Sequence, residues 1–449
     1  MPKNLYEGSI LKNIGLFSVP FLIANFLQTL YGLADLFIVG QFTGAVEITA
    51  VAVGSQFMHF LTAIIIGLAM GTTVLVGRAV GSRKIKSISR IVGNTTVLFL
   101  GFSLVVMAIL LALCPQVVSV LSTPAEAVGD TSRYLMICFV GIPFVVAYNV
   151  IASVFRGLGD SKSPMYFIAI ACILNVGLDY LLIGAFGMGA SGAAYATVLA
   201  QTFSVLLALA YIRFSKSAMA GIDFSRRDFK IHKGIMAAIL KIGVPVACQD
   251  GFIQVSFLFI TAIANSRGLE IAAAVGVVEK IICFLFLVPS AMLSSVSAIG
   301  AQNIGAGRYD RARQTLACGV AIAACFGALC SVLFQFISEP VLSLFTDDAQ
   351  VIVYGTQYLR VYVVDCMVAG IHFCFSGYFC ACGYSIISFI HNALSIALMR
   401  VPGAYFASKW WPERMEPMAA ATLIGSTISV FICLGAYAWL RRRNRDQLR

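Results

Sequence analysis

Charged side chains are scarce in this sequence of 449 residues, where Asp, Glu, Lys and Arg together make up only 11%. A water-soluble domain usually carries about 25% charged residues, so this chain has too few to cover its surface in water. Hydrophobic residues make up 60%, and the mean hydropathy is +0.92. The composition therefore indicates a membrane protein, and the length leaves room for about a dozen helical spans of ~20 residues.

Several motifs that carry chemistry are also missing. The thirteen cysteines form no CxxC pair and the four histidines are scattered, so we expect neither a disulfide framework nor a metal centre of that kind. No glycine-rich loop carries a Walker A lysine, which excludes nucleotide as the energy source. No cluster of His, Asp and Ser marks a membrane face, which disfavours an integral-membrane enzyme acting on lipids. We expect a protein without catalysis and without a cofactor.

Long apolar runs separated by helix breakers predict an all-α fold. The first run, 14–40, is too long for the core of a signal peptide and should stay as the first span. The runs are continuous rather than alternating, so a β-barrel is excluded. Twelve helices are expected near 14–40, 48–77, 91–113, 131–156, 164–185, 189–212, 236–265, 271–300, 314–337, 352–380, 386–407 and 417–440.

The basic residues predict the orientation of these spans. The formal net charge is +11, but 24 of the 31 Lys and Arg lie in alternate connections, which are 1–12, 78–90, 156–162, 213–241, 308–313 and 441–449. That placement follows the positive-inside rule and argues against a nucleic-acid partner. Both termini are predicted to be cytoplasmic, in a multi-pass protein of the plasma (inner) membrane.

The two halves of the chain look like copies of each other. Ser18-Val-Pro20 matches Gly243-Val-Pro245, and Pro115 matches Pro340, at a constant offset of 225 residues. The predicted division is an N-terminal six-helix lobe (1–212), a cytoplasmic linker (213–235), a C-terminal six-helix lobe (236–441) and a basic tail (442–449). Six helices separate the copies, so they are parallel repeats, an arrangement that places a transported substrate near the midplane between halves.

Four further stretches carry a resemblance to a known family: Leu33-Ala-Asp35-Leu-Phe-Ile-Val-Gly40, Ala50-Val-Ala-Val-Gly54, Val76-Gly-Arg-Ala-Val-Gly81 and Phe155-Arg-Gly-Leu-Gly-Asp160-Ser-Lys-Ser-Pro164. With them the chain resembles the bacterial multidrug and toxin extrusion (MATE) transporters over essentially its whole length. The resemblance implies twelve helices in two lobes. It also implies export of amphipathic, often cationic compounds, driven by inward flow of Na⁺ or H⁺.

The same resemblance implies a cation site in the N-terminal lobe. Its residues correspond to Asp35 on the first helix, Asn175 and Asp179 on the fifth, Thr197 on the sixth and Asn149 on the fourth. In the C-terminal lobe the sequence departs from a branch of the family that has an acid on helix seven. The resemblance therefore leaves open whether that lobe holds a second coupling site.

The residues themselves support a site at these acids. Asn175 and Asp179 are spaced i, i+4 and share one helix face. An acid at membrane depth costs at least ~2.5–3.5 kcal/mol, so it is rare unless it has a function. Two carboxylates with amide and hydroxyl oxygens suit Na⁺, and a close carboxylate pair also suits a proton, so both ions stay open. The competing interpretation is that Asp35 is solvated and Asp179 only bonds neighbouring helices.

Other polar and aromatic residues in the spans are candidates for the substrate cleft. Gln254 and Asp365 could face a cationic substrate, or could instead hydrogen-bond neighbouring helices. Gln28, Tyr31 and Tyr148 could contribute to an adaptable wall, against the alternative of ordinary packing.

These features predict a secondary antiporter that exchanges an amphipathic drug or toxin for Na⁺ or H⁺ by alternating access. Its partners would be the small substrate and the lipid bilayer, and we expect a monomer. The alternative within transport is a flippase for lipid-linked saccharides, which twelve spans and few buried Lys or Arg disfavour.

Overall fold

The computed structural model describes residues 4–214, 222 and 224–447. Part of the predicted linker (215–221 and 223) and the end of the predicted tail (448–449) lie outside the described residues. All regular structure within the described residues is helical. In this part of the chain eleven helices are long and apolar enough to span a membrane, and there are twelve if the pair Ala125–Val140 and Ile142–Gly157, bent by 48°, is counted as one broken span. The twelve-span, all-α fold predicted from the sequence is confirmed.

The chain folds into two compact units. Unit 1 comprises residues 1–5 and 19–243, and unit 2 comprises residues 6–18 and 244–449. Two long helices contribute to both units, α1 (Ile10–Phe42) and α9 (Lys233–Asn265). The divisions fall shortly before Pro20 and Pro245, the prolines inside these two helices, where each proline ring removes one backbone hydrogen bond.

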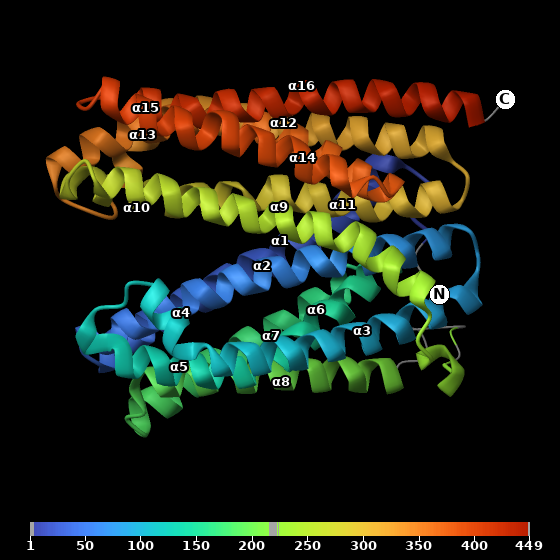
Figure 1. Ribbon diagram of the computed structural model, residues 1–449, viewed down its shortest axis with the longest axis horizontal. Helices are drawn as coiled ribbons and strands as arrows, with labels where there is room; N and C mark the ends of the chain where they lie inside the picture. Colours follow the sequence, from blue (N-terminus) through green and yellow to red (C-terminus); the bar gives the residue numbers. More distant parts are fainter. Residues whose placement is uncertain (1–3, 215–221, 223, 448–449) are drawn as a thin grey trace. The chain divides into compact units, whose positions relative to one another are not determined.

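Within each unit the long helices run side by side (Figure 1). The other helices of unit 1 are α2 (Ala45–Gly81), α3 (Ile85–Ala112), α4 (Cys114–Val120), η1 (Ala125–Ala127), α5 (Val128–Val140), α6 (Ile142–Gly157), α7 (Lys162–Asp179), η2 (Tyr180–Ala185), α8 (Gly189–Phe214) and η3 (Arg226–Phe229). Those of unit 2 are α10 (Leu269–Leu285), α11 (Leu287–Gly305), α12 (Tyr309–Leu342), α13 (Ala349–Cys382), α14 (Ser385–Ser395), η4 (Ile396–Arg400), α15 (Val401–Trp410) and α16 (Glu416–Gln447).

Two glycines allow a close approach of α2 and α9 in unit 1. A Cβ atom at Gly71 of α2 would lie 2.2 Å from the backbone oxygen of Ile239 in α9. At Gly243 of α9 it would lie 2.2 Å from the backbone oxygen of Leu68 in α2. Small residues permit this contact between backbones, as they do at many helix crossings in membranes.

The described end of the predicted linker is bound to unit 1. The Asn94 side chain on α3 accepts a hydrogen bond from the backbone N–H of His232 (2.7 Å) and donates one to the carbonyl of Asp228 (3.3 Å). Ser225 and Asp228 close a capping box at the start of η3. The chain therefore enters α9 through an ordered turn.

The start of α1 is held within unit 2 by two arginines near the beginning of α12. Arg308 donates a hydrogen bond to the carbonyl of Tyr6 (2.8 Å), and Arg311 donates one to the carbonyl of Gly8 (3.0 Å). The segment before the first span thus lies beside the basic connection 308–313.

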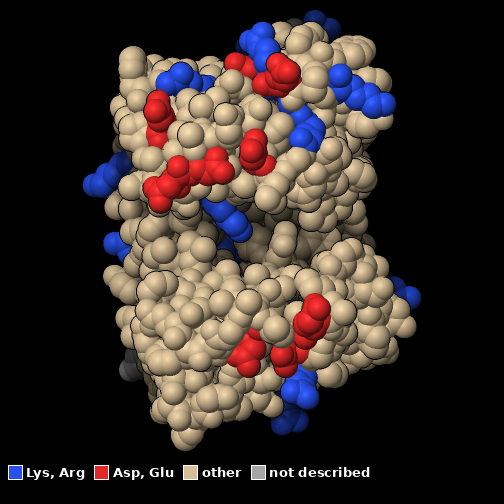
Figure 2. Space-filling model, turned by 90° about the vertical axis from the view of Figure 1, so that its left-hand side faces the viewer, with Lys and Arg blue, Asp and Glu red and all other residues tan. Residues whose placement is uncertain are grey.

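The surface of the helices suits lipid. Large apolar side chains on the spans face outward, among them Ile173 (75% exposed), Phe336 (77%) and Phe431 (69%). At the end of the molecule seen in Figure 2, charged groups occupy only scattered places on a largely uncharged surface. Such exposure would be costly in water but is expected in a bilayer.

Candidate functional site

Three helices of unit 1 bring the predicted ion-binding residues together. Asp35 lies on α1, Asn175 and Asp179 lie on the last turns of α7, and Thr197 lies on α8. Asp179 is the last residue of α7 and is followed directly by the π-helical turn η2. Such turns are uncommon and often occur at functional sites. We refer to Asp35, Asn175, Asp179 and Thr197 as the acidic cluster.

A hydrogen bond joins α8 to α1 in this cluster. The hydroxyl of Thr197 donates to Oδ2 of Asp35 at 3.1 Å. The phenol of Tyr31, one turn earlier on α1, donates to the backbone carbonyl of Thr197 at 3.1 Å. Tyr31, a candidate for the substrate cleft on sequence grounds, is therefore a neighbour of the acidic cluster.

The acidic cluster is buried and holds polar atoms without partners. Asp35 is 2% exposed, and Asn175 and Asp179 are fully buried. Five atoms have no hydrogen-bond partner among the described residues: Oδ1 of Asp35, both side-chain amide atoms of Asn175 and both carboxylate oxygens of Asp179. The carboxyl groups of Asp35 and Asp179 are close enough to interact electrostatically. Buried polar atoms are normally satisfied, so this group of five calls for an explanation.

The chemistry of these atoms fits a small hard cation or a proton. Carboxylate, amide and hydroxyl oxygens are the ligands preferred by alkali and alkaline-earth cations. Two carboxylates in a dry site repel each other, and either a bound cation or a shared proton relieves that repulsion. Na⁺ held here would contact Asp35, Asn175 and Asp179.

The remaining predicted member of the ion site, Asn149, lies in another setting. It lines a cavity of unit 1 together with Gln28 and Tyr148, two of the candidates for the substrate cleft. The amide of Asn149 donates to the carbonyl of Val145 (2.9 Å) on its own helix. Asn149 therefore lines this cavity, and among the described residues no interaction joins it to Asp35.

The repeat positions in unit 2 are apolar. Asp35 corresponds to Ile260, which is 1% exposed and belongs to an apolar cluster with Ala404 and Ala421. Asp179 corresponds to Gly403, at an offset of 224 in this part of the repeat, where a Cβ atom would lie 2.9 Å from that of Ala421. The space that the acids occupy in unit 1 is thus filled by hydrocarbon in unit 2.

The two candidates in unit 2 have different surroundings. Asp365 on α13 is 2% exposed, its Oδ1 has no hydrogen-bond partner among the described residues, and Ser426 and Arg400 are its polar neighbours. Arg400 donates to the phenol of Tyr362 (2.9 Å) and lies 4.6 Å from the centroid of the Phe257 ring. Gln254 on α9 is partly exposed, and no interaction joins it to Asp365 among the described residues.

One buried and one partly buried arginine were not singled out from the sequence. Arg156 was counted as part of a basic connection, and Arg400 was counted as part of a span, yet Arg156 is only 8% exposed and Arg400 contacts the interior of unit 2. The available signal for Arg400 was a basic residue inside an apolar run. For Arg156, proximity to a loop hid the burial.

The family comparison matches both halves of the chain. The sequence model of the MatE family matches residues 20–181 and again residues 245–406, the second match beginning and ending 225 residues after the first. This is the offset at which the two halves of the sequence repeat, so the internal duplication is confirmed.

Individual relatives cover nearly the whole chain. The probable multidrug resistance protein YpnP of Bacillus subtilis is 30% identical over 408 residues, 91% of each chain. The multidrug export protein MepA of Staphylococcus haemolyticus is 23% identical over 441 residues, covering 97% of this chain and 95% of the relative.

Solved structures share the fold. A crystal structure of a MATE protein in the straight conformation has a TM-score of 0.89 at 22% identity, over 98% of this chain and 97% of the other. An outward-facing multidrug resistance MATE transporter of the MOP superfamily has a TM-score of 0.88 at 22% identity, over 98% of this chain and 97% of the other. With the family match in both halves and a relative of 30% identity along most of its length, this chain belongs to the MatE family of multidrug efflux transporters.

Proposed function

We propose that this transporter is a secondary antiporter in which a cation or proton binds the acidic cluster of unit 1 and drives export of an amphipathic, cationic drug or toxin. The observation that carries the proposal is the set of five buried polar atoms without partners on Asp35, Asn175 and Asp179. A carboxylate pair in this setting is stabilised by whatever supplies positive charge, and the ion gradient supplies Na⁺ or H⁺.

Coupling requires a difference in affinity between states. The acidic cluster draws its members from α1, α7 and α8, so binding of an ion between them favours the conformation in which the three helices are close. If the substrate prefers the other conformation, each ligand lowers the affinity for the other, and the effect is reciprocal. Alternating access of the two halves then exchanges ion for substrate.

The proposed substrate class rests on the descriptions of the relatives and on one buried acid of this chain, Asp365. Relatives are described as multidrug resistance or multidrug export proteins. Asp365, buried in unit 2 with one carboxylate oxygen without a partner, is the acid we assign to contact with a cationic substrate. Following the distribution of Lys and Arg, we propose that the protein lies in the plasma (inner) membrane with both termini in the cytoplasm. We expect it to be a monomer.

The proposal is tested with purified protein in proteoliposomes. Export of a cationic dye is measured under an imposed Na⁺ gradient without a pH gradient, and separately under a pH gradient without Na⁺. At least one gradient should drive dye movement against its concentration. Equal movement with and without either gradient would exclude ion-coupled antiport.

A further inference from the structure

Unit 1 holds a second polar feature, separate from the acidic cluster. A cavity lies between α1, α2 and α6, next to the turn that leads into α7, and its polar lining comes from Asn25, Gln28, Tyr148, Asn149, Arg156 and Ser161. Phe21, Ala24 and Ile66 supply apolar walls. Its lining includes no carboxylate.

The charged group of this cavity is a buried guanidinium. Arg156 is only 8% exposed, and its guanidinium carbon lies 5.4 Å from the centroid of the Phe21 ring. No salt bridge joins it to an acid within the described part of the chain. The acid nearest in sequence, Asp160, is already occupied: it accepts from the backbone N–H groups of Lys162 (3.0 Å) and Ser163 (3.2 Å) and from the Ser163 hydroxyl (2.6 Å).

The neighbouring side chains also leave donors available. No hydrogen bond joins the side chains of Asn25, Gln28 or Ser161 to another of the described residues, and the Tyr148 phenol donates to the carbonyl of Pro164 (3.2 Å). The cavity therefore combines a positively charged guanidinium with the amide donors of Asn25 and Gln28 and the hydroxyl donor of Ser161. A buried charge is normally paired, so a guanidinium without an acid partner favours binding of an acceptor.

We propose that this cavity binds the phosphate or carboxylate group of an anionic ligand, with Arg156 as the bidentate contact. A guanidinium presents parallel N–H groups that match such oxyanions, and Asn25 and Gln28 add further donors. Both amides keep part of their surface exposed, which leaves access beside α1. Phe21 and Ile66 would contact the apolar part of an amphiphile. The positive charge makes this cavity unsuitable for a cationic drug, so it is a site distinct from substrate and coupling ion.

Binding is measured on the purified full-length protein by native mass spectrometry and by thermal unfolding. The probes are short-chain phosphatidic acid, phosphatidylcholine of the same chain length, and inorganic phosphate. Phosphatidic acid should bind and raise the unfolding temperature, whereas phosphatidylcholine should not. Arg156→Gln should weaken phosphatidic acid at least tenfold, and Arg156→Lys should weaken it less. Arg133→Gln is the matched control, because that side chain is 71% exposed and lies 3.8 Å from Asp130.

The three probes distinguish a soluble anion from a lipid headgroup as the ligand. Binding of inorganic phosphate that depends on Arg156 supports a site for a soluble anion, and binding of phosphatidic acid alone supports a lipid headgroup. If Arg156→Gln does not fold, Gln28→Leu combined with Asn25→Leu should weaken the same probe several-fold. Unchanged affinity in these variants, or equal binding of both lipids, would overturn the proposal. No ion gradient is used, so this result is independent of the test of antiport.

Discussion

The hydroxyl of Thr197 on α8 donates a hydrogen bond of 3.1 Å to Oδ2 of Asp35 on α1. This bond ties together two spans that are 162 residues apart in the chain, and it leaves Oδ1 of Asp35 without a partner. The acid is therefore positioned by one oxygen while the other stays available. An ion that binds Oδ1 of Asp35 would add a further link to α1, which the hydrogen bond already joins to α8.

Thr197→Val should lower the affinity for the coupling ion without unfolding the protein. A hydrogen bond to a charged group contributes about 1.5–3 kcal/mol, so the ion concentration for half-maximal transport should rise roughly ten- to hundredfold. Thr202→Val is the control, because the hydroxyl of Thr202 bonds only to Val198 on its own helix (2.8 Å). Ion-titrated dye export in proteoliposomes checks this. An unchanged ion dependence in Thr197→Val would argue against a role in the site.

Ile260→Asp should destabilise unit 2 and should not create a second ion site. The position is 1% exposed among apolar side chains, and a carboxylate inside a membrane protein costs at least about 2.5–3.5 kcal/mol. Ile260→Val, which keeps the site apolar, should cost only about 0.5–1.5 kcal/mol. Thermal unfolding of the two variants checks the order. A gain of ion-dependent transport in Ile260→Asp would show that unit 2 can accept the chemistry of unit 1.

Gly71→Ala should disturb the contact between α2 and α9 in unit 1. The new Cβ atom would lie 2.2 Å from the Ile239 carbonyl oxygen, so backbones must move apart, at a cost of about 1–3 kcal/mol. Gly101→Ala is the matched control on α3, because nothing lies within 4 Å of a Cβ atom there. It should be neutral or slightly stabilising. The unfolding temperature in detergent checks both, and equal values would contradict the close approach.

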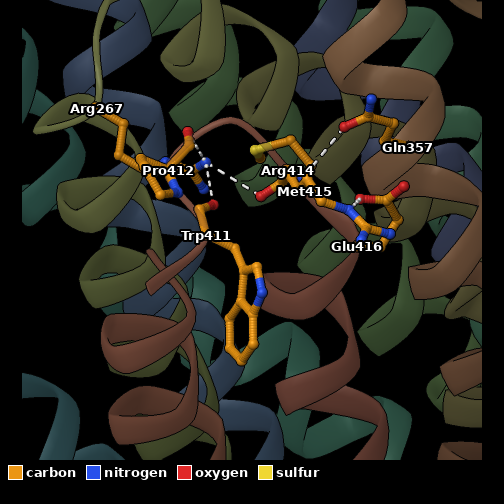
Figure 3. A network of polar contacts seen from close by, with 7 residues as sticks. All are labelled: Arg267, Gln357, Trp411, Pro412, Arg414, Met415 and Glu416. Atoms are coloured by element: carbon orange, nitrogen blue, oxygen red, sulfur yellow. Dashed lines mark hydrogen bonds and ion pairs between the residues drawn. The ribbon is translucent and has the colours of Figure 1, made fainter. Parts of the chain in front are cut away.

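Arg267 fastens the connection between α15 and α16 (Figure 3). Its guanidinium donates to the backbone carbonyls of Trp411 (3.3 Å), Pro412 and Arg414 (3.1 Å). Next to it, Gln357 accepts from the backbone N–H of Met415 (3.2 Å). Burial lowers the pKa of Arg267. The carbonyl acceptors offset the cost of holding that charge partly away from water.

Arg267→Ala should therefore loosen the connection 411–416. Losing charge-assisted hydrogen bonds costs about 1.5–3 kcal/mol each at most, and some are replaced by water at this exposed site. The expected result is faster proteolytic cleavage within 411–416 and a modestly lower unfolding temperature. Arg360→Ala is the control, because that side chain is exposed. Equal cleavage rates for the two variants would contradict the assigned role.

Several features were predictable from sequence for physical reasons. Twelve apolar runs must form helices in lipid, because only helices satisfy their own backbone there without a closed barrel. The Asn-x3-Asp spacing shows that Asn175 and Asp179 share a helix face. The helix ends were less predictable. The structure begins α12 at Tyr309, five residues before the expected 314. The expected start followed the apolar run, whereas the first turns of the helix also include the charged Arg311 and Arg313.

Other features depend on packing that no local pattern reports. Tyr31 was one candidate for the wall of the substrate cleft, with ordinary packing as the alternative, and the sequence did not show that its phenol hydrogen-bonds to the carbonyl of Thr197. Arg156 stands at the start of a basic connection, and its burial beside Phe21 of α1 follows from packing. That the position matching Asp35 in unit 2 carries no carboxylate could be predicted from Ile260, because an aligned apolar residue shows this without packing information.

Gradient-driven export by Asp35→Asn and Asp179→Asn tests the central claim most directly. Each variant keeps the size of the side chain and removes the charge, and Asp130→Asn, near the beginning of α5 and paired with Arg133 at 3.8 Å, is the control. All three proteins are reconstituted after their folding is verified by gel filtration and thermal unfolding. If the acidic cluster binds the coupling ion, dye export under the effective Na⁺ or pH gradient is lost in Asp35→Asn and Asp179→Asn and retained in Asp130→Asn. Full gradient-driven export by both cluster variants would contradict it.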